Sequence, residues 1–250
     1  MSVRWIFLAA CLAILPAVSG PAAAGKTAGG GGSCAECHRG LKGPDDLKHT
    51  YPDWKRSVHA AAGVGCEACH GGDPVKTGRE AAHAGVLPSS QPGSPVYFTV
   101  IPKTCGVCHA KELAAFRRSV HYRELQTSGR GPNCVTCHGA MASRVLEPKT
   151  MEMTCTLCHR RPTQAYAARM SLTHSADQVR RLGRAVERGR QAGVDVTAQA
   201  RELADLTARQ ARAVVDWHTF DMAGVLGATQ AVSRRAATAT NELKLKGAGE

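Results

Sequence analysis

Five copies of one pentapeptide, Cys-x-x-Cys-His, constrain this chain more than any other feature of its 250 residues. Ten of its 11 cysteines belong to these copies, and a histidine directly follows each pair. The copies are Cys34-Ala-Glu-Cys37-His38, Cys66-Glu-Ala-Cys69-His70, Cys105-Gly-Val-Cys108-His109, Cys134-Val-Thr-Cys137-His138 and Cys155-Thr-Leu-Cys158-His159. This is the attachment signature of c-type haem, in which two thiols bind the vinyl groups of one porphyrin and the adjacent imidazole binds iron. The sequence therefore predicts five covalent haems whose proximal ligands are His38, His70, His109, His138 and His159.

Three other uses of paired cysteines explain the motif less completely. A disulfide framework or a set of redox-active Cys-x-x-Cys pairs gives no reason for a histidine after every pair. Zinc is also bound by clusters of cysteine and histidine, but a tetrahedral zinc site does not require the histidine at the fifth position. Haem attachment is the interpretation that explains the whole motif.

The sixth coordination position of each iron decides between an electron carrier and an enzyme. An iron with two protein ligands passes electrons, whereas an iron with one can also bind a small molecule. We predict that the distal ligands are His59, His83, His121, His174 and His218, with His49 as a possible alternative. His49 ranks lower because it lies in a polar, turn-like stretch. Sulfur ligation is a further alternative, for which the candidates are Met151, Met153, Met170 and Met222.

An internal repeat supports two of these ligands. Trp54-Lys-Arg-Ser-Val-His59 and Phe116-Arg-Arg-Ser-Val-His121 each precede a haem motif that is followed by glycine. On a continuous helix, Trp54 and Val58 would share a face beside His59, and such a face could pack against a porphyrin. The alternative is an ordinary amphipathic helix with a surface histidine.

The other three candidates have weaker contexts. His83 lies among alanines, which would let a haem approach closely. His174 ends a looser version of the repeat, Arg169-Met-Ser-Leu-Thr-His174. His218 follows Trp217 near the end of an expected helix, on its apolar edge.

The N-terminal segment, residues 1–24, is typical of a secretory signal peptide. Arg4 precedes an apolar stretch from Trp5 to Leu15, and small residues follow up to Ala24. This order of charge, apolar centre and small residues predicts export, with cleavage after Ala24 and no membrane anchor afterwards. We expect a periplasmic protein. A lipid anchor at Cys11 is the minor alternative.

Composition changes along the rest of the chain. Residues 25–33 are rich in glycine and predict a flexible leader. Residues 34–175 hold all five motifs and predict a pentahaem domain, mainly α-helical with little regular β structure. Residues 176–250 predict a C-terminal helical segment that packs on the haem domain. At its start, Ser175 and Gln178 resemble a capping box for a helix that ends before Gly193. A second helix is expected from about Thr197 to Phe220, packing on the haem domain.

The formal net charge of +12 suggests a nucleic-acid partner until the haems are considered. Five haems with two propionates each would add about ten negative charges. We therefore expect the excess lysine and arginine to neutralise propionates, and we predict no nucleic-acid partner. The porphyrins would also supply the flat apolar surface that a chain with only 4% aromatic residues lacks.

The repeat before Cys-x-x-Cys-His-Gly, the segment Cys66 to Pro74 with a downstream His83, and the late Asp216-Trp-His218 resemble the bacterial multihaem cytochrome c superfamily. It includes the nitrifier tetrahaem cytochrome, tetrahaem quinol dehydrogenases, pentahaem nitrite reductase and hydroxylamine oxidoreductase. The resemblance implies a mostly helical fold with closely packed, mainly bis-histidine haems. Unlike nitrite reductases, which carry a motif ending in lysine, this chain has five motifs that all end in histidine.

These features predict a pentahaem carrier that passes electrons between periplasmic or membrane redox partners. The expected partners are a quinol dehydrogenase, a terminal reductase or an outer-membrane conduit. Two alternatives are an oxidoreductase acting on a small nitrogen or sulfur compound at one five-coordinate haem, and an electron-transfer subunit of a larger complex. The oligomeric state is not predicted.

Overall fold

The computed structural model of this chain describes residues 32–41, 51–145 and 147–248, and in these ranges every regular element is a helix. The prediction of a mainly α-helical fold is confirmed. Short helices come first, at α1 (Gly32–His38), α2 (Tyr51–Lys55), α3 (Val58–Ala61), α4 (Glu67–His70), α5 (Arg79–Ala82), α6 (Ile101–Cys105), α7 (Ala110–Phe116), α8 (Val120–Ser128), α9 (Cys134–His138) and α10 (Pro148–Cys155). Long helices follow at α11 (Thr163–Gln191), α12 (Thr197–Asp216) and α13 (Met222–Leu243), with a 3₁₀ turn at Trp217–Thr219 and a π-helical end at Lys244–Ala248.

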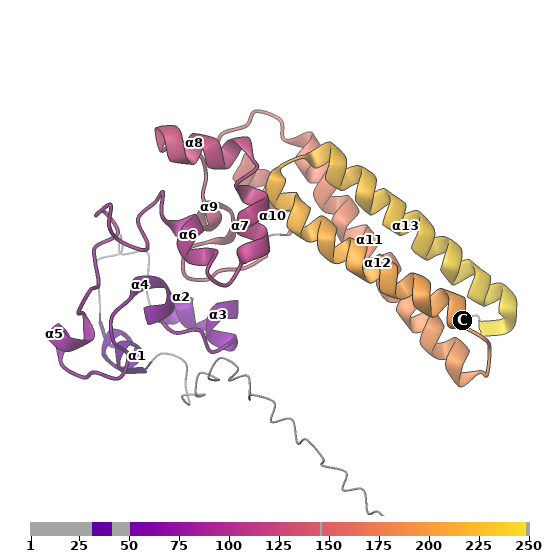
Figure 1. The fold of residues 1–250 in the computed structure, drawn as a ribbon, viewed down its shortest axis with the longest axis horizontal. Helices are drawn as coiled ribbons and strands as arrows, with labels where there is room; N and C mark the ends of the chain where they lie inside the picture. Colours follow the sequence, from indigo (N-terminus) through magenta and orange to yellow (C-terminus); the bar gives the residue numbers. More distant parts are fainter. Residues whose placement is uncertain (1–31, 42–50, 146, 249–250) are drawn as a thin grey trace, which may run out of the picture.

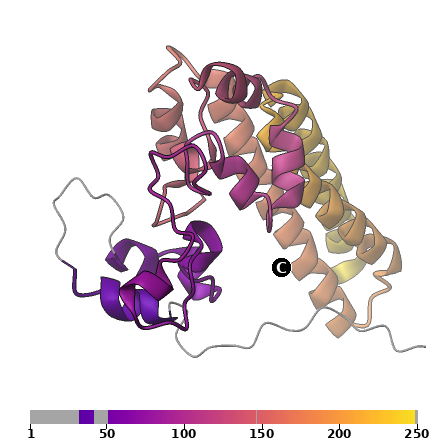
Figure 2. The same ribbon diagram turned by 60° about the vertical axis from the view of Figure 1, so that its left-hand side comes forward.

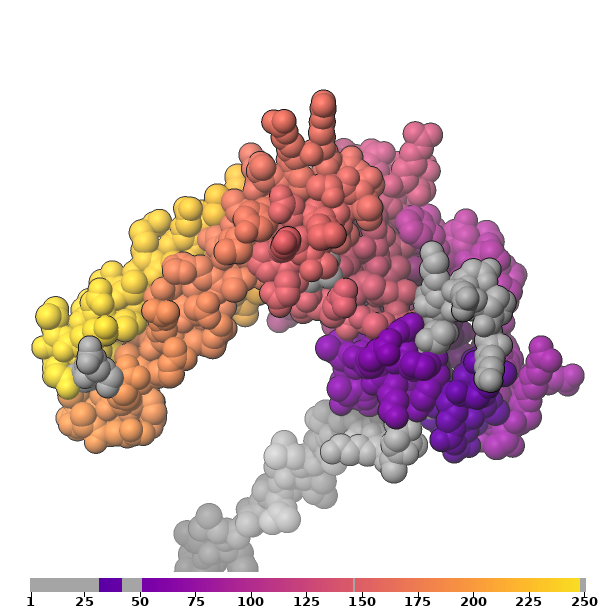
Figure 3. All heavy atoms as spheres, turned by 180° about the vertical axis from the view of Figure 1, so that it is seen from behind, coloured from indigo at the N-terminus to yellow at the C-terminus, as the bar shows by residue number. Residues whose placement is uncertain are grey.

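The helices form three groups in space. Helices α1 to α5 lie together at one end, and α6 to α10 lie between them and the three long helices (Figures 1 and 2). Helices α11, α12 and α13 run side by side as an elongated bundle. The space-filling view shows the far end of this bundle extending away from the part of the molecule that carries the motifs (Figure 3).

The short helices are short because their sequences contain frequent stop signals. Gly71 and Gly139 directly follow the histidines of the second and fourth motifs and have φ values of 75° and 83°, a conformation that favours glycine. Gly72 also has a positive φ, and a Cβ there would lie 2.5 Å from the carbonyl oxygen of Ala82. Glycine therefore allows the segment after the second motif to pass close to α5, where Asp73 N–H donates to the same carbonyl at 3.0 Å.

The bundle has an aliphatic core. Leu182, Val186, Leu206, Val232 and Leu243 are 0 or 1% exposed and form one cluster. Burial of each such side chain contributes about 1.5–3 kcal/mol to folding. The bundle is therefore stabilised by its own packing.

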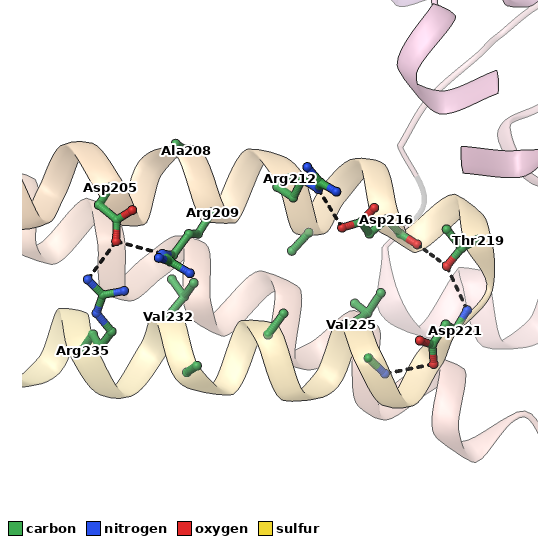
Figure 4. A pocket seen from close by; sticks show the side chains of 14 residues that line it. Asp205, Ala208, Arg209, Arg212, Asp216, Thr219, Asp221, Val225, Val232 and Arg235 are labelled. Atoms are coloured by element: carbon green, nitrogen blue, oxygen red, sulfur yellow. Dashed lines mark hydrogen bonds and ion pairs between the residues drawn. The ribbon is translucent and has the colours of Figure 1, made fainter. Parts of the chain in front are cut away.

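Charged groups link α12 to α13 along one side of this bundle. Arg235 on α13 donates two hydrogen bonds to Glu202, at 2.7 and 2.8 Å, and also lies 2.8 Å from Asp205. Asp205 accepts a further bond from Arg209, as Figure 4 shows. These groups are partly exposed, so they contribute less than the aliphatic core.

The expected capping box at Ser175 is wrong. Helix α11 runs through this position, so the expected boundary between residues 175 and 176 falls inside a helix. Ser175 is fully buried, and its hydroxyl donates to Gln210 Oε1 on α12 at 2.7 Å. The serine acts in tertiary packing because the upstream sequence continues the helix.

The other helix predictions for this region agree with the structure. Helix α11 ends at Gln191, and Gly193 has a φ of 71°, which confirms the predicted break. Helix α12 begins at Thr197 as expected and continues into the 3₁₀ turn before Phe220. Helix α13 was not predicted. Nowhere in the described ranges is a helix both long and apolar enough to cross a membrane.

Candidate haem-binding sites

The cysteines of each motif lie on a helical turn or at its edge. In the second, third and fifth motifs, the histidine N–H donates to the carbonyl of the first cysteine, at 2.9, 2.9 and 2.8 Å. In such a turn, residues three apart lie on the same side. All ten motif cysteines are free thiols. Each motif can therefore present two thiols to one planar group.

Histidine rings from distant parts of the chain face each other in four pairs. Each pair joins one predicted proximal ligand to one predicted distal ligand. The distances between ring centres are 6.0 Å for His38 and His83, 6.3 Å for His109 and His59, 5.7 Å for His159 and His121, and 6.1 Å for His138 and His218.

These separations fit one metal ion between two imidazoles. A ring nitrogen binds a metal at about 2 Å, so two rings on opposite sides of one ion have centres about 6 Å apart. In the pair His121–His159 the two Nε2 atoms face each other at 3.5 Å. A thiol pair beside each facing pair completes the donor set of a c-type haem with two axial histidines. The residues present therefore fit the predicted cofactor at four of the five motifs.

Backbone carbonyls orient three of these rings. Nδ1 of His83 lies 2.7 Å from the carbonyl oxygen of Arg79, and Nδ1 of His138 lies 2.9 Å from that of Arg144. Nδ1 of His218 lies 3.2 Å from the carbonyl oxygen of Val215. A bond from Nδ1–H to a carbonyl leaves Nε2 as the basic nitrogen, which is how metal-binding histidines are commonly held.

Burial favours the neutral form of two distal candidates. Burial lowers the pKa of His121, and the nearby His159 lowers it further. Burial also lowers the pKa of His218, an effect that the carbonyl of Val215 partly opposes. A neutral imidazole is the form that binds a metal ion.

The internal repeat has a different structure from the one expected. The continuous helix predicted for Trp54 to His59 is wrong, because α2 ends at Lys55 and α3 begins at Val58. The break comes from Ser57, whose hydroxyl accepts the N–H of Ala60 at 3.1 Å and caps α3. Val58 is 59% exposed, so it does not form the expected apolar face.

The second copy of the repeat has the same construction. Helix α7 ends at Phe116, and Ser119 caps α8 by accepting the N–H of Tyr122 at 3.0 Å. Each copy therefore places its histidine, His59 or His121, in the first turn after a serine cap. These two caps were not predicted, although serine before a short apolar run is a known start signal for a helix.

The two remaining distal candidates, His174 and His49, do not form such a pair in the described ranges. His174 is exposed on α11, and its Nε2 lies 3.5 Å from Gln178 Nε2 on the same helix. In the described part of the chain it forms no ring contact with another histidine. His49 and Cys11 lie outside the described residues. The ligand opposite His70 therefore remains a prediction.

The methionine candidates have other surroundings. Met151 is buried with its sulfur 3.5 Å from Cys155 Sγ, and Met222 packs against the small apolar cluster that contains Leu172 and Val225. Met153 and Met170 are exposed.

Motifs that follow one another in the sequence also lie next to one another. Ser33 N–H, beside the first motif, donates to the carbonyl of Pro74, just after the second, at 2.9 Å. Helix α9, which is the fourth motif, contacts both α6 and α10, which lead into the third and fifth. A hydrogen bond between Cys105 and Cys134, together with burial, raises the pKa of Cys134. Burial raises the pKa of Cys137 to about 11, and the nearby Cys155 adds to the rise.

The second and third motifs complete this series. Burial raises the pKa of Cys69, and the charges of Cys105 and Cys108 in the third motif raise it further. The charge of Cys34 in the first motif likewise raises the pKa of Cys66 in the second, after burial, so thiols of successive motifs interact along the whole series. No three potential ligands among His, Cys, Asp and Glu converge in the described ranges, as they would in the zinc site considered above.

Comparison with known proteins supports the predicted class in its general form, multihaem c-type cytochrome. The chain is 27% identical over 148 residues to the C-type polyheme cytochrome OmcC of Geobacter sulfurreducens, which is 59% of this chain and 16% of that protein. It is 32% identical over 130 residues to OmcB of the same organism, which is 46% of this chain and 15% of that protein. The chain thus spans about one sixth of the length of these relatives. The similarity does not single out the nitrifier, quinol dehydrogenase or hydroxylamine oxidoreductase groups.

No protein-family model matches the chain, and no solved structure is similar to it.

Proposed function

We propose that this chain is an exported pentahaem c-type cytochrome that carries electrons between redox proteins outside the cytoplasm. The observation that carries the proposal is the set of four facing histidine pairs, each beside a Cys-x-x-Cys pair. The relatives in Geobacter sulfurreducens are named as polyheme cytochromes, which supports the same function.

When bound, c-type haem supplies a one-electron couple whose potential depends on its axial ligands and their surroundings. The chain contributes the rest. Its cysteine pairs would attach successive haems, and its four facing histidine pairs would supply two protein ligands to each of four irons. Closed axial positions favour electron transfer over substrate binding.

The succession of neighbouring motifs favours a relay. Because the thiols of adjacent motifs lie close together, electrons entering at one end would have short steps to the other. The partners we propose are a quinol dehydrogenase or another donor on one side, and a terminal reductase or outer-membrane conduit on the other.

The test is haem quantitation by the pyridine assay, combined with EPR of the ferric protein. We expect five haems per chain and low-spin signals only. Fewer than five haems would contradict the pentahaem assignment. A high-spin signal that shifts on addition of nitrite or hydroxylamine would contradict the carrier function and indicate an oxidoreductase.

A further inference from the structure

The corner between α12 and α13 contacts two of the candidate haem sites. Its 3₁₀ turn carries His218, which faces His138 of the fourth motif. The next residue but one, Phe220, packs against His121, which faces His159 of the fifth motif. One short segment of the long-helix bundle therefore reaches both sites.

Polar groups hold this corner in place. Thr219 Oγ1 donates to the carbonyl of Asp216 at 2.7 Å and accepts the N–H of Asp221 at 3.1 Å, as Figure 4 shows. The Asp216 carboxylate lies 3.2 Å from Arg212 on its own helix and 3.5 Å from Arg118. Arg118 directly precedes Ser119, the cap of the helix that carries His121, so the ion pair joins the corner to that helix.

Phe220 has an unusual backbone conformation. Its φ is 60°, and it is the one non-glycine residue with positive φ in the described ranges. For a bulky residue this conformation is costly, so it persists only where the surroundings favour it. Here it directs the ring to His121, with the two ring centres 4.2 Å apart and an interplanar angle of 81°. This is an edge-to-face contact.

His121 differs from the other oriented rings in its hydrogen bonding. His83, His138 and His218 each have Nδ1 close to a backbone carbonyl. Nδ1 of His121 is buried and has no hydrogen-bond partner in the described part of the chain. A bond from Nδ1–H makes an imidazole a stronger electron donor to its metal, so His121 is the weaker donor.

We propose that Phe220 is the positioning residue of His121, holding the imidazole by ring packing, whereas a carbonyl holds His83, His138 and His218. A weaker donor stabilises the ferric state less, so the haem of His121 and His159 should have a higher reduction potential than the haem of His138 and His218. Both rings of the second pair have a carbonyl acceptor. This inference rests on the proposed function, since it concerns axial ligands of bound haem.

The experiment uses the full-length holoprotein and EPR-monitored redox titration. Signals lost in His121→Ala and in His218→Ala identify the two haems. In the wild type, we expect the signal assigned through His121 to titrate at the higher potential. The reverse order would overturn the proposal.

Variants of Phe220 separate ring packing from backbone conformation. Phe220→Gly suits a positive φ and removes the ring, which would let water reach Nδ1. We expect it to lower the potential of the His121 haem and to shift its g-values, with the other signals unchanged. Phe220→Tyr keeps an aromatic ring, so the potential and the g-values of the His121 haem should stay at their wild-type values. Tyr166→Ala, which removes an exposed aromatic ring on α11, is the matched control.

Failure of the inference is distinguishable from failure of the proposed function. Five low-spin haems with no change in Phe220→Gly would overturn the role of Phe220 and leave the carrier intact. Absence of haem from the wild-type protein would overturn both. If Phe220→Gly fails to accumulate, the wild-type protein still tests the proposal, because the haem assigned through His121 must then have a higher potential than the haem assigned through His218.

Discussion

The imidazole of His59 lies 6.3 Å, centre to centre, from that of His109, although His59 precedes the second motif and His109 ends the third. The other pairs are also formed across the sequence. His83 follows the second motif and faces the first, and His121 follows the third and faces the fifth. A motif and its opposite histidine thus come from different segments of the chain.

We predict that His59→Ala converts one of the five haems from low-spin to high-spin and leaves all five attached. The distal ligand would be lost, whereas the thioether bonds of the third motif would not be touched. EPR and the pyridine assay on the same sample measure the two quantities. Five low-spin haems in the variant would contradict the assignment of His59.

The exposed His174 should behave differently. Its position beside Gln178 on α11 leads us to predict that His174→Ala keeps every low-spin signal of the wild type. His49→Ala is the parallel variant, because His49 is the other candidate for the iron of His70. A new high-spin signal in His174→Ala, with none in His49→Ala, would restore the original prediction of His174 as ligand.

The serine caps should contribute to stability. Ser119 is 4% exposed and satisfies the N–H of Tyr122, so Ser119→Ala should lower the free energy of unfolding by about 1 kcal/mol. Ser119→Asp keeps an N-cap acceptor and should recover most of this loss. Denaturant unfolding monitored at the haem absorbance measures the effect. Ser128→Ala, at the exposed far end of α8, serves as control, and an equal loss there would argue against the cap.

Acid should weaken the link between α12 and α13. The hydrogen bond from Arg209, and then that from Arg235, lower the pKa of Asp205 below its ordinary value of 3.8. At lower pH the unfolded chain therefore binds this proton more readily than the folded chain, and stability falls. We expect the melting temperature of the helices, followed by circular dichroism, to drop as the pH falls below 3.8, the ordinary pKa of an aspartate.

The matched variant for the acid prediction is Arg235→Gln, which removes one of the two arginines at Asp205. The drop should be smaller in this variant, because less of the pKa shift remains. A drop of the same size in both proteins would show that Asp205 is not responsible. The group is exposed, so the expected difference is small.

The sequence indicated which residues are candidate haem ligands, but not how the histidines pair across the fold. The motif cysteines and histidines were identifiable because their chemistry depends on spacing within five residues. The pairing of His138 with His218 was not, since it depends on the path of the long helices between them. Phe220 was missed for the same reason: its importance lies in a backbone conformation and a contact that no local pattern indicates.

Some local expectations were wrong because a residue can form two kinds of hydrogen bond. Ser57 was expected inside a helix and instead caps one, and Ser175 was expected as a cap and instead lies inside one. Serine hydroxyls compete for backbone groups in either setting. Which setting occurs is decided by the neighbouring segments and by tertiary contacts such as that of Ser175 with Gln210.

In the proposed cytochrome, the crossing of the histidine pairs would make distal ligation depend on the whole fold. A proximal histidine adjoins its cysteines and could bind its iron in an unfolded chain, whereas His218 lies beyond two long helices and reaches His138 only in the folded chain. The spin state of each iron would therefore report whether two remote segments have met. During unfolding, the absorbance change of each haem on loss of its distal ligand should show which parts of the chain separate first.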